Sequence, residues 1–167
     1  MKKSFFKIIT NFEEISSGLF LIVTTALVLL NVFLRYFLNM GIVWSEEVAT
    51  GCFVWSVFLG SAACYKRGMH VGVDMLIKKF SKPIQNKINL FIYFILLIIN
   101  SSLSVISFQY IKVSARKPTP VLGISSAFIS SSILISFVLI TFYTIIFIVR
   151  DIKAIKNDDK EKGEIVC

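Results

Sequence analysis

The charged and polar residues that could do chemistry stand where apolar stretches of the chain begin or end. Arg35 follows Asn31 by one helical turn, and Glu46 and Glu47 open the next apolar stretch. An arginine at the edge of a membrane is costly unless it is paired, and a carboxylate at the start of the adjoining helix is its natural partner. The spacing therefore predicts a structural polar cluster of Arg35, Asn31, Glu46 and Glu47. Which carboxylate pairs with Arg35 stays open, and the alternative is two unrelated charges in water.

Other residue types associated with catalysis or metal binding are sparse. His70 is the only histidine, and no group of Cys and His residues has the spacing of a metal site. Cys52 and Cys64 are separated by about 18 Å of helical rise, too far for a disulfide. No Ser–His–Asp set, phosphate-binding loop or pair of catalytic carboxylates is recognisable. We expect neither enzymatic activity nor a cofactor in this chain.

Four apolar stretches position these residues. A helix needs roughly 20 apolar residues to cross a bilayer, and each stretch reaches about that length without a charged residue. A β-barrel would need alternating polarity, which is absent, so an all-α integral membrane protein with four transmembrane helices is predicted. The hydrophobic content of 56% and the mean hydropathy of +0.78 agree. We expect one domain over residues 1–150, with spans at about 15–38, 46–65, 84–112 and 121–149.

The distribution of basic residues predicts the orientation. Of the 18 Lys and Arg residues, only Arg35, Lys112, Arg116 and Lys117 fall on the side of the connections between spans one and two and between spans three and four. Short loops rich in Lys and Arg stay in the cytoplasm, so both termini and the middle loop are expected there. The net charge of +8 is therefore ascribed to membrane topology and lipid contact rather than to nucleic acid.

Segments outside the spans also carry predictions. Residues 1–14 have apolar positions at helical spacing with lysines between them, which is typical of an amphipathic helix lying on the membrane surface. The first span is expected to be retained rather than cleaved as a signal peptide, because Glu13 and Glu14 interrupt it. Residues 151–167 are expected to form a charged, disordered cytoplasmic tail. Spans three and four are long, which favours strong tilting in the membrane.

Small and polar residues inside the spans favour close helix packing. Gly60, Ser104 and Ser130 are the predicted packing positions, while Tyr36 and Trp44 are expected to anchor the chain at the membrane interface. No ionisable residue occupies the centre of any span, whereas coupled carriers usually keep one there. A self-sufficient transporter is therefore disfavoured, and a larger partner is implied. A homo-oligomeric channel lined by serine faces is the alternative.

Several short motifs follow one another along the chain in a fixed order. They are Asn31-x-x-x-Arg35-Tyr36-Phe37, Trp44-Ser45-Glu46-Glu47, Gly60, Gly68-Met69-His70-Val71-Gly72-Val73-Asp74 and Leu122-Gly123-Ile124-Ser125. Their order resembles that in the small membrane subunit of tripartite ATP-independent periplasmic (TRAP) transporters, and the resemblance covers nearly the whole chain.

The resemblance implies a helper role in the bacterial inner membrane. In that family a large multi-span subunit holds the substrate and sodium sites and moves as an elevator, and a periplasmic binding protein delivers an organic acid such as a C4-dicarboxylate or sialic acid. The small subunit enlarges the stationary scaffold. Arg35 with Glu46 and Glu47 would then be structural, and His70 and Asp74 would organise the cytoplasmic turn. Another small assembly or signalling subunit is the competing class.

Overall fold

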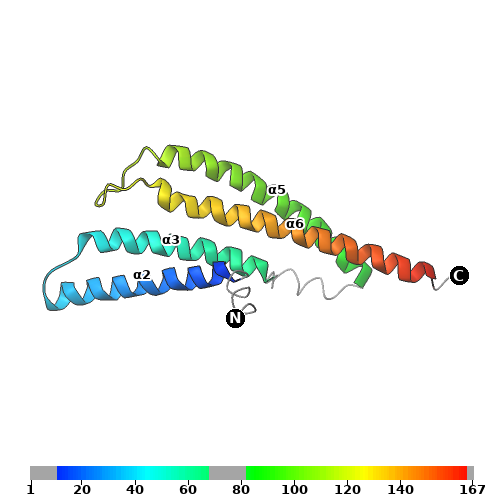
Figure 1. Cartoon of the computed structure of the whole chain (residues 1–167), viewed down its shortest axis with the longest axis horizontal. Coiled ribbons are helices and arrows are strands. Elements are labelled where there is room, and N and C mark those ends of the chain that lie inside the picture. Colours follow the sequence, from blue (N-terminus) through cyan, green and yellow to red (C-terminus); the bar gives the residue numbers. More distant parts are fainter. Residues whose placement is uncertain (1–10, 68–81, 165–167) are drawn as a thin grey trace, which may run out of the picture.

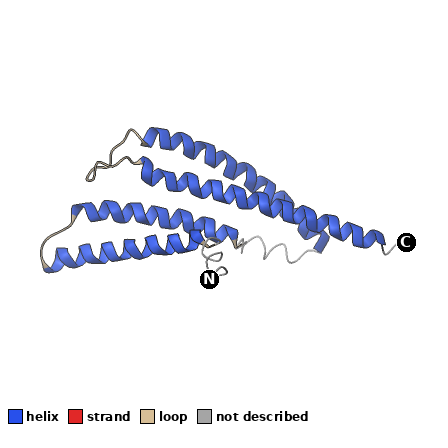
Figure 2. Ribbon diagram, in the orientation of Figure 1, coloured by secondary structure: helices blue, strands red, loops and turns tan. Residues whose placement is uncertain are grey.

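The computed structural model describes residues 11–67 and 82–164 of the chain, and these ranges consist of long helices and the connections between them (Figures 1 and 2). The helices are α2 (Phe12–Phe37), α3 (Val43–Lys66), α5 (Lys82–Ser114) and α6 (Ala127–Glu164). Each is long and apolar enough to cross a membrane. The prediction of an all-α protein with four membrane-spanning helices is confirmed.

Helices α2 and α3 form an antiparallel pair joined by residues 38–42. In α2, Glu13 and Glu14 lie in the first turn and Arg35 in the last, where each charge complements the helix dipole. The helix ends because Asn39 adopts a left-handed conformation with φ of 51°, and the backbone N–H of Met40 donates back to the Leu34 carbonyl. Helix α3 begins at Val43, slightly before the expected start at residue 46.

The connection between α5 and α6 corrects the expected start of span four. Residues 121–126 were expected to be helical, but α6 begins at Ala127. Residues 117–126 instead form a tight turn, in which Pro118 and Ser125 make an isolated antiparallel bridge and Thr119 donates its N–H to the Ile124 carbonyl. Gly123 adopts φ of +65°, a conformation that ends regular helix and favours glycine.

The far end of α6 also differs from the expectation. The helix continues to Glu164 instead of ending near residue 149, so most of the expected disordered tail is helical. The sequence after Asp151 contains no proline and is rich in Lys, Glu and Ile, most of which are good helix formers, so nothing interrupts the helix that the membrane span starts.

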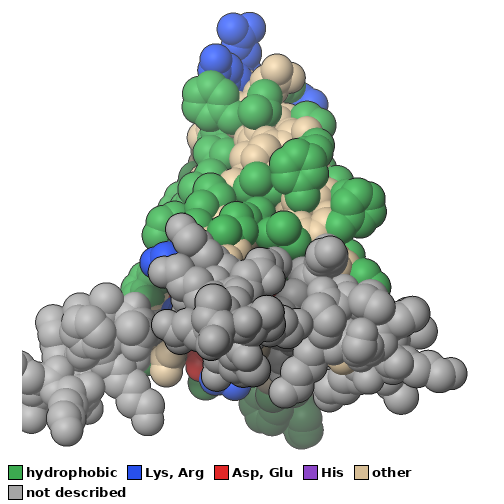
Figure 3. All heavy atoms as spheres, turned by 90° about the vertical axis from the view of Figure 1, so that its right-hand side faces the viewer, with side chains coloured by type: hydrophobic (Ala, Val, Ile, Leu, Met, Phe, Trp, Pro, Cys, Tyr) green, Lys and Arg blue, Asp and Glu red, His purple; other side chains and the backbone are tan. Residues whose placement is uncertain are grey.

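The four helices lie side by side in a row instead of forming a closed bundle. Helix α3 packs against α2 on one side and α6 on the other, and α6 also packs against α5, which gives the order α2, α3, α6, α5 (Figure 1). The outer helix α2 buries one residue, Glu13, whereas the inner helix α3 buries six. Hydrophobic side chains therefore remain on the surface, as Figure 3 shows from the right-hand side of Figure 1.

Several predictions concern residues outside the described ranges or properties that depend on a membrane. The interfacial helix falls largely on residues 1–10, and His70 and Asp74 fall on 68–81, all outside the described residues; Phe12, Glu13 and Glu14 belong to α2. The orientation and the tilt of the helices stay predictions. We call the end of the molecule with residues 38–42 and 115–126 the connection end, and the opposite end, with Glu13 and Lys66, the terminal end.

Candidate functional site

A buried carboxylate joins three helices at the terminal end. Glu13 of α2 is 6% exposed, and its Oε2 lies 2.9 Å from the Lys66 ammonium at the end of α3. The Tyr143 hydroxyl of α6 donates to Oε1 of the same carboxylate. The Lys66 ammonium also lies 5.4 Å from the centre of the Tyr143 ring. We call Glu13, Lys66 and Tyr143 the Glu13 cluster.

A second ion pair lies beside the Glu13 cluster. Arg67 pairs with Glu14, but their side chains are 58% and 32% exposed, so water screens this contact. In the Glu13 cluster, by contrast, both carboxylate oxygens have partners in a protected site, as a buried charge requires. The Glu13 cluster thus stabilises the packing of α2, α3 and α6 more than the Arg67–Glu14 pair does.

Sequence reasoning missed the Glu13 cluster, although a signal was present. Glu13 and Glu14 open span one, and Lys66 and Arg67 close span two. Because two helices joined by a short connection run antiparallel, the start of one lies beside the end of the other. Opposite charges at these two positions indicate an ion pair at the terminal end. The contribution of Tyr143 comes from another part of the chain and had no such local signal.

At the connection end the predicted polar cluster is divided in two. Asn31 accepts a bond from the Ile42 N–H at 2.9 Å and donates weakly to Glu46 at 3.5 Å. Glu47 points elsewhere, towards the turn before α6. Arg35 lines a cavity together with Asn31 and Glu46, but it forms no ion pair with Glu46 or Glu47 in the described part of the chain. The structure thus does not place Arg35 in an ion pair with either carboxylate, and the pairing stays a prediction.

Glu47 fastens α3 to the connection between α5 and α6. Its Oε2 accepts the backbone N–H groups of Val121 at 2.9 Å and Leu122 at 3.2 Å. These N–H groups are free to donate because residues 121 and 122 lie in the turn and not in a helix. The carboxylate thus performs the role that a helix cap performs elsewhere, and it does so between two segments far apart in sequence.

Hydroxyl groups join neighbouring helices along their length. Ser17 and Ser56 each donate to the other's carbonyl at 2.9 Å across the α2–α3 contact. Between α3 and α6, Ser136 donates to the Phe58 carbonyl at 2.7 Å, and the hydroxyls of Tyr65 and Thr144 lie 2.5 Å apart. Such bonds add modestly to helix association in a membrane.

The three predicted packing residues lie in different surroundings. Gly60 is at the α2–α3 contact, where a Cβ would lie 2.8 Å from Ser17 Oγ. Ser130 is buried, and both Ser104 and Ser130 donate to the carbonyl four residues earlier in their own helices. The predicted interfacial anchors Tyr36 and Trp44 lie at the connection end with 79% and 47% of their surface exposed.

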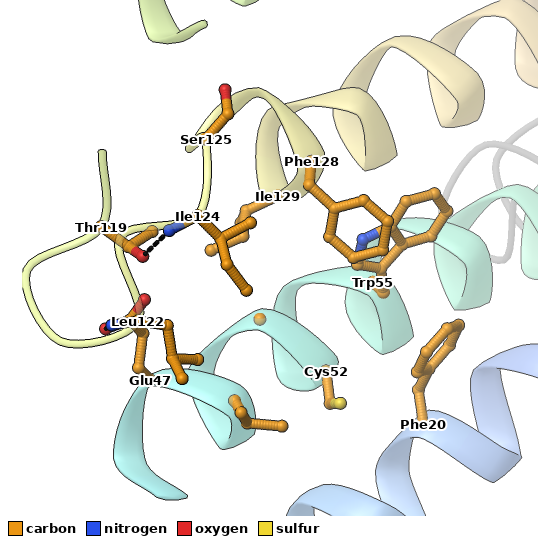
Figure 4. Close-up of a pocket in the computed structure, with 12 residues that line it drawn as sticks. Phe20, Glu47, Cys52, Trp55, Thr119, Leu122, Ile124, Ser125, Phe128 and Ile129 are labelled. Atoms are coloured by element: carbon orange, nitrogen blue, oxygen red, sulfur yellow. Dashed lines mark hydrogen bonds between the residues drawn. The ribbon is translucent and has the colours of Figure 1, made fainter. Parts of the chain in front are cut away.

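A cavity of about 250 Å³ lies between α3, α6 and the turn that Glu47 holds. Figure 4 shows Glu47 beside Leu122, and Trp55 between the rings of Phe128 and Phe20. The Trp55 ring centroid is 5.8 Å from each of these two rings. Within the described ranges, no three His, Cys, Asp or Glu residues are grouped as metal ligands.

The helices and their contacts define a class of protein before any comparison. Four apolar helices fastened by polar contacts define a multi-pass membrane protein without a recognisable catalytic centre in the described residues. A family model described as "Tripartite ATP-independent periplasmic transporters, DctQ component" matches residues 24–154. The chain belongs to this family of TRAP transporter small permease subunits, which are transport components of the bacterial inner membrane and not enzymes.

Individual relatives support the same family. The C4-dicarboxylate TRAP transporter small permease protein DctQ of Vibrio cholerae is 36% identical over 81 residues, which are 46% of this chain and 35% of that protein. A putative TRAP transporter small permease protein of Haemophilus influenzae is 37% identical over 79 residues, which are 47% of this chain and 49% of that protein. The sialic acid TRAP transporter small permease protein SiaQ of Vibrio cholerae is 27% identical over 124 residues, covering 74% and 72%. This chain thus aligns with about a third and about half of the first two proteins.

Proposed function

We propose that this chain is the non-transporting small subunit of a sodium-coupled TRAP transporter for an organic acid. It enlarges and stabilises the stationary scaffold of a large elevator subunit and helps to dock a periplasmic binding protein. The names of the relatives favour a C4-dicarboxylate or a sialic acid as the substrate. Sodium binds in the large subunit, and both termini of this chain lie in the cytoplasm.

The row of helices is the observation that carries this proposal. A closed bundle would bury its helices against one another, but here α2 and α5 each pack mainly against one neighbour. Broad apolar faces remain for a larger membrane partner, in keeping with the large exposed hydrophobic patches that mark interaction sites. The central parts of the spans carry no ionisable group for substrate or ion coupling. Both features suit a scaffold better than a carrier.

Reconstitution tests this proposal. Liposomes containing only this chain are expected to show no sodium-driven uptake of a labelled C4-dicarboxylate or sialic acid. Uptake of one of these acids should appear when a large TRAP membrane subunit and a periplasmic binding protein that form a complex with this chain are added. Uptake by the small subunit alone, above that of empty liposomes, would contradict the helper role.

Co-purification separates this proposal from its alternatives. A tagged chain expressed with the large subunit should retain that multi-span protein through gel filtration. A homo-oligomeric channel would retain only further copies of itself, and an assembly or signalling subunit of a different complex would leave this uptake intact when its gene is deleted. Deletion is expected instead to abolish uptake.

A further inference from the structure

One face of α3 forms the floor of a groove between α2 and α6. The cavity at the connection end adjoins a second cavity of about 440 Å³, and Phe20 and Trp55 line both. The second cavity continues past Leu59 to Glu13 at the terminal end. We call the two cavities together the Trp55 groove.

Two buried polar atoms in the Trp55 groove have no hydrogen-bond partner among the described residues. They are Oε1 of Glu47, whose other oxygen holds the turn, and Nε1 of Trp55. A buried polar atom without a partner has lost its hydrogen bonds to water without replacement, so native proteins rarely leave one unpaired without a reason. The Trp55 groove thus presents the Glu47 carboxylate as a hydrogen-bond acceptor and, about two turns further along α3, the Trp55 indole N–H as a donor.

The remaining walls are apolar and set the kind of molecule that fits. Gly51, Leu122 and Ile129 surround the space between the two unpaired atoms. Glu47 and Trp55 are eight residues apart, which is about 12 Å of helical rise, so no single side chain of a partner serves both atoms. A partner helix of about 10–12 Å diameter is too wide to enter such a cavity.

The geometry points to a membrane phospholipid with a primary ammonium head group, such as phosphatidylethanolamine, as the occupant. Its ammonium donates to Glu47 Oε1, an ester carbonyl accepts from Trp55 Nε1, and one acyl chain lies along α3 towards Leu59. Glu47 to Leu59 spans about 18 Å of helix, close to the roughly 15 Å depth of one leaflet. Such binding requires only that the chain resides in a membrane and does not depend on the proposed transport role.

Trp55 itself can report on the site, because Trp44 is the only other tryptophan in the chain. In the full-length Trp44→Phe protein in detergent micelles, phosphatidylethanolamine with brominated acyl chains should quench Trp55 fluorescence at about a tenfold lower concentration than brominated phosphatidylcholine. The latter has a quaternary ammonium without N–H donors, and one charge-assisted hydrogen bond is worth about that factor. Equal quenching by the two lipids would overturn the assignment.

Substitutions identify the contacts in the same background. Glu47→Gln keeps an oxygen for the Val121 and Leu122 N–H groups but removes the charge, so the preference for phosphatidylethanolamine should vanish. Glu46→Gln is the matched control and should keep it, because Glu46 bonds to Asn31 instead. Persistence of the preference in Glu47→Gln would show that Glu47 does not bind the head group.

A second variant tests the groove without altering either unpaired atom. A Cβ on Gly51 would lie 3.7 Å from the Ile129 side chain, so Gly51→Leu should fill the cavity and weaken quenching by both lipids. Circular dichroism confirms that each variant is helical before lipid is added. Quenching that disappears when the large membrane subunit binds would assign the groove to that protein and overturn the lipid proposal.

Discussion

Among single residues, Glu13 and Arg35 show how depth and partners decide what a charge contributes. Glu13 is buried, and both of its oxygens are engaged by other helices. Arg35 lies at the edge of a cavity without an ion-pair partner in the described chain, and a long arginine side chain can reach water from there. The ion pairs between α2 and α3 in the described residues lie at the terminal end, opposite the end where the sequence predicts one.

The Glu13 cluster should contribute more to stability than the neighbouring pair. Lys66→Met leaves the buried Glu13 carboxylate without its cation, whereas Arg67→Met leaves Glu14 partly in water. A buried pair that loses one partner is destabilised by about 3–5 kcal/mol, and an exposed pair by about 0–1 kcal/mol. The melting temperature in lipid nanodiscs should therefore fall much more for Lys66→Met than for Arg67→Met. Glu13→Gln added to Lys66→Met should recover part of the loss, and equal shifts for the two Met variants would contradict this ranking.

The stability effects of Glu47→Ala and Arg35→Ala can be compared in the same way. Glu47→Ala removes the carboxylate that accepts the Val121 and Leu122 N–H groups and frees the turn before α6, so it should lower the stability of the isolated chain by more than Arg35→Ala does. Arg35→Ala should change the stability of the isolated chain by less than about 0.5 kcal/mol, as for ordinary surface substitutions. Denaturation of both variants by urea in the same micelles measures the difference. A larger loss in Arg35→Ala would restore the original pairing hypothesis.

Between helices, the close contact of α2 with α3 depends on Gly60 and the two serines that exchange hydrogen bonds. Gly60→Ala would place a methyl group against Ser17 Oγ and should break its bond to Ser56. Gly18 of α2 is the matched control, because nothing lies within 4 Å of a Cβ there. Gly18→Ala should stabilise by up to about 1 kcal/mol through helix propensity, and Gly60→Ala should lose that gain or destabilise. An equal rise in melting temperature for Gly60→Ala and Gly18→Ala would show that the α2–α3 contact can accommodate the methyl group.

The helices themselves could be predicted from the sequence far better than their ends and neighbours. Hydropathy and length indicate the spans because a lipid-exposed backbone must satisfy its own hydrogen bonds. The start of α6 could not be placed, because residues 121–126 are as apolar as the helix but follow two prolines and contain Gly123. The Glu47 contact with Val121 and Leu122 depends on that turn, so it was also beyond the sequence. The order in which the helices pack, α2, α3, α6, α5, could not be predicted either, because hydropathy does not indicate which helices are neighbours.

The arrangement of all four helices can be tested by the distance between α2 and α5, which is longer in a row than in a closed bundle. Interaxial spacings are about 8–10 Å, so three successive contacts separate α2 from α5 by roughly 24–30 Å. A square four-helix bundle with the same spacing would bring them within roughly 10–14 Å. Val32 of α2 and Ile106 of α5 are 48% and 58% exposed and can carry spin labels without disturbing the packing.

The pair of labels should report a long distance in the isolated chain and the same distance in the transporter. Electron–electron double resonance on the Val32→Cys/Ile106→Cys protein, with Cys52, Cys64 and Cys167 replaced by serine, should give a main distance above about 20 Å. If the row is the surface that a large subunit uses, adding that subunit should narrow the distribution without moving its centre, because the scaffold stays fixed. A main distance near 12 Å in the isolated chain would show a closed bundle. A shift from short to long on assembly would mean that the partner opens the bundle, and the row would then belong to the complex alone.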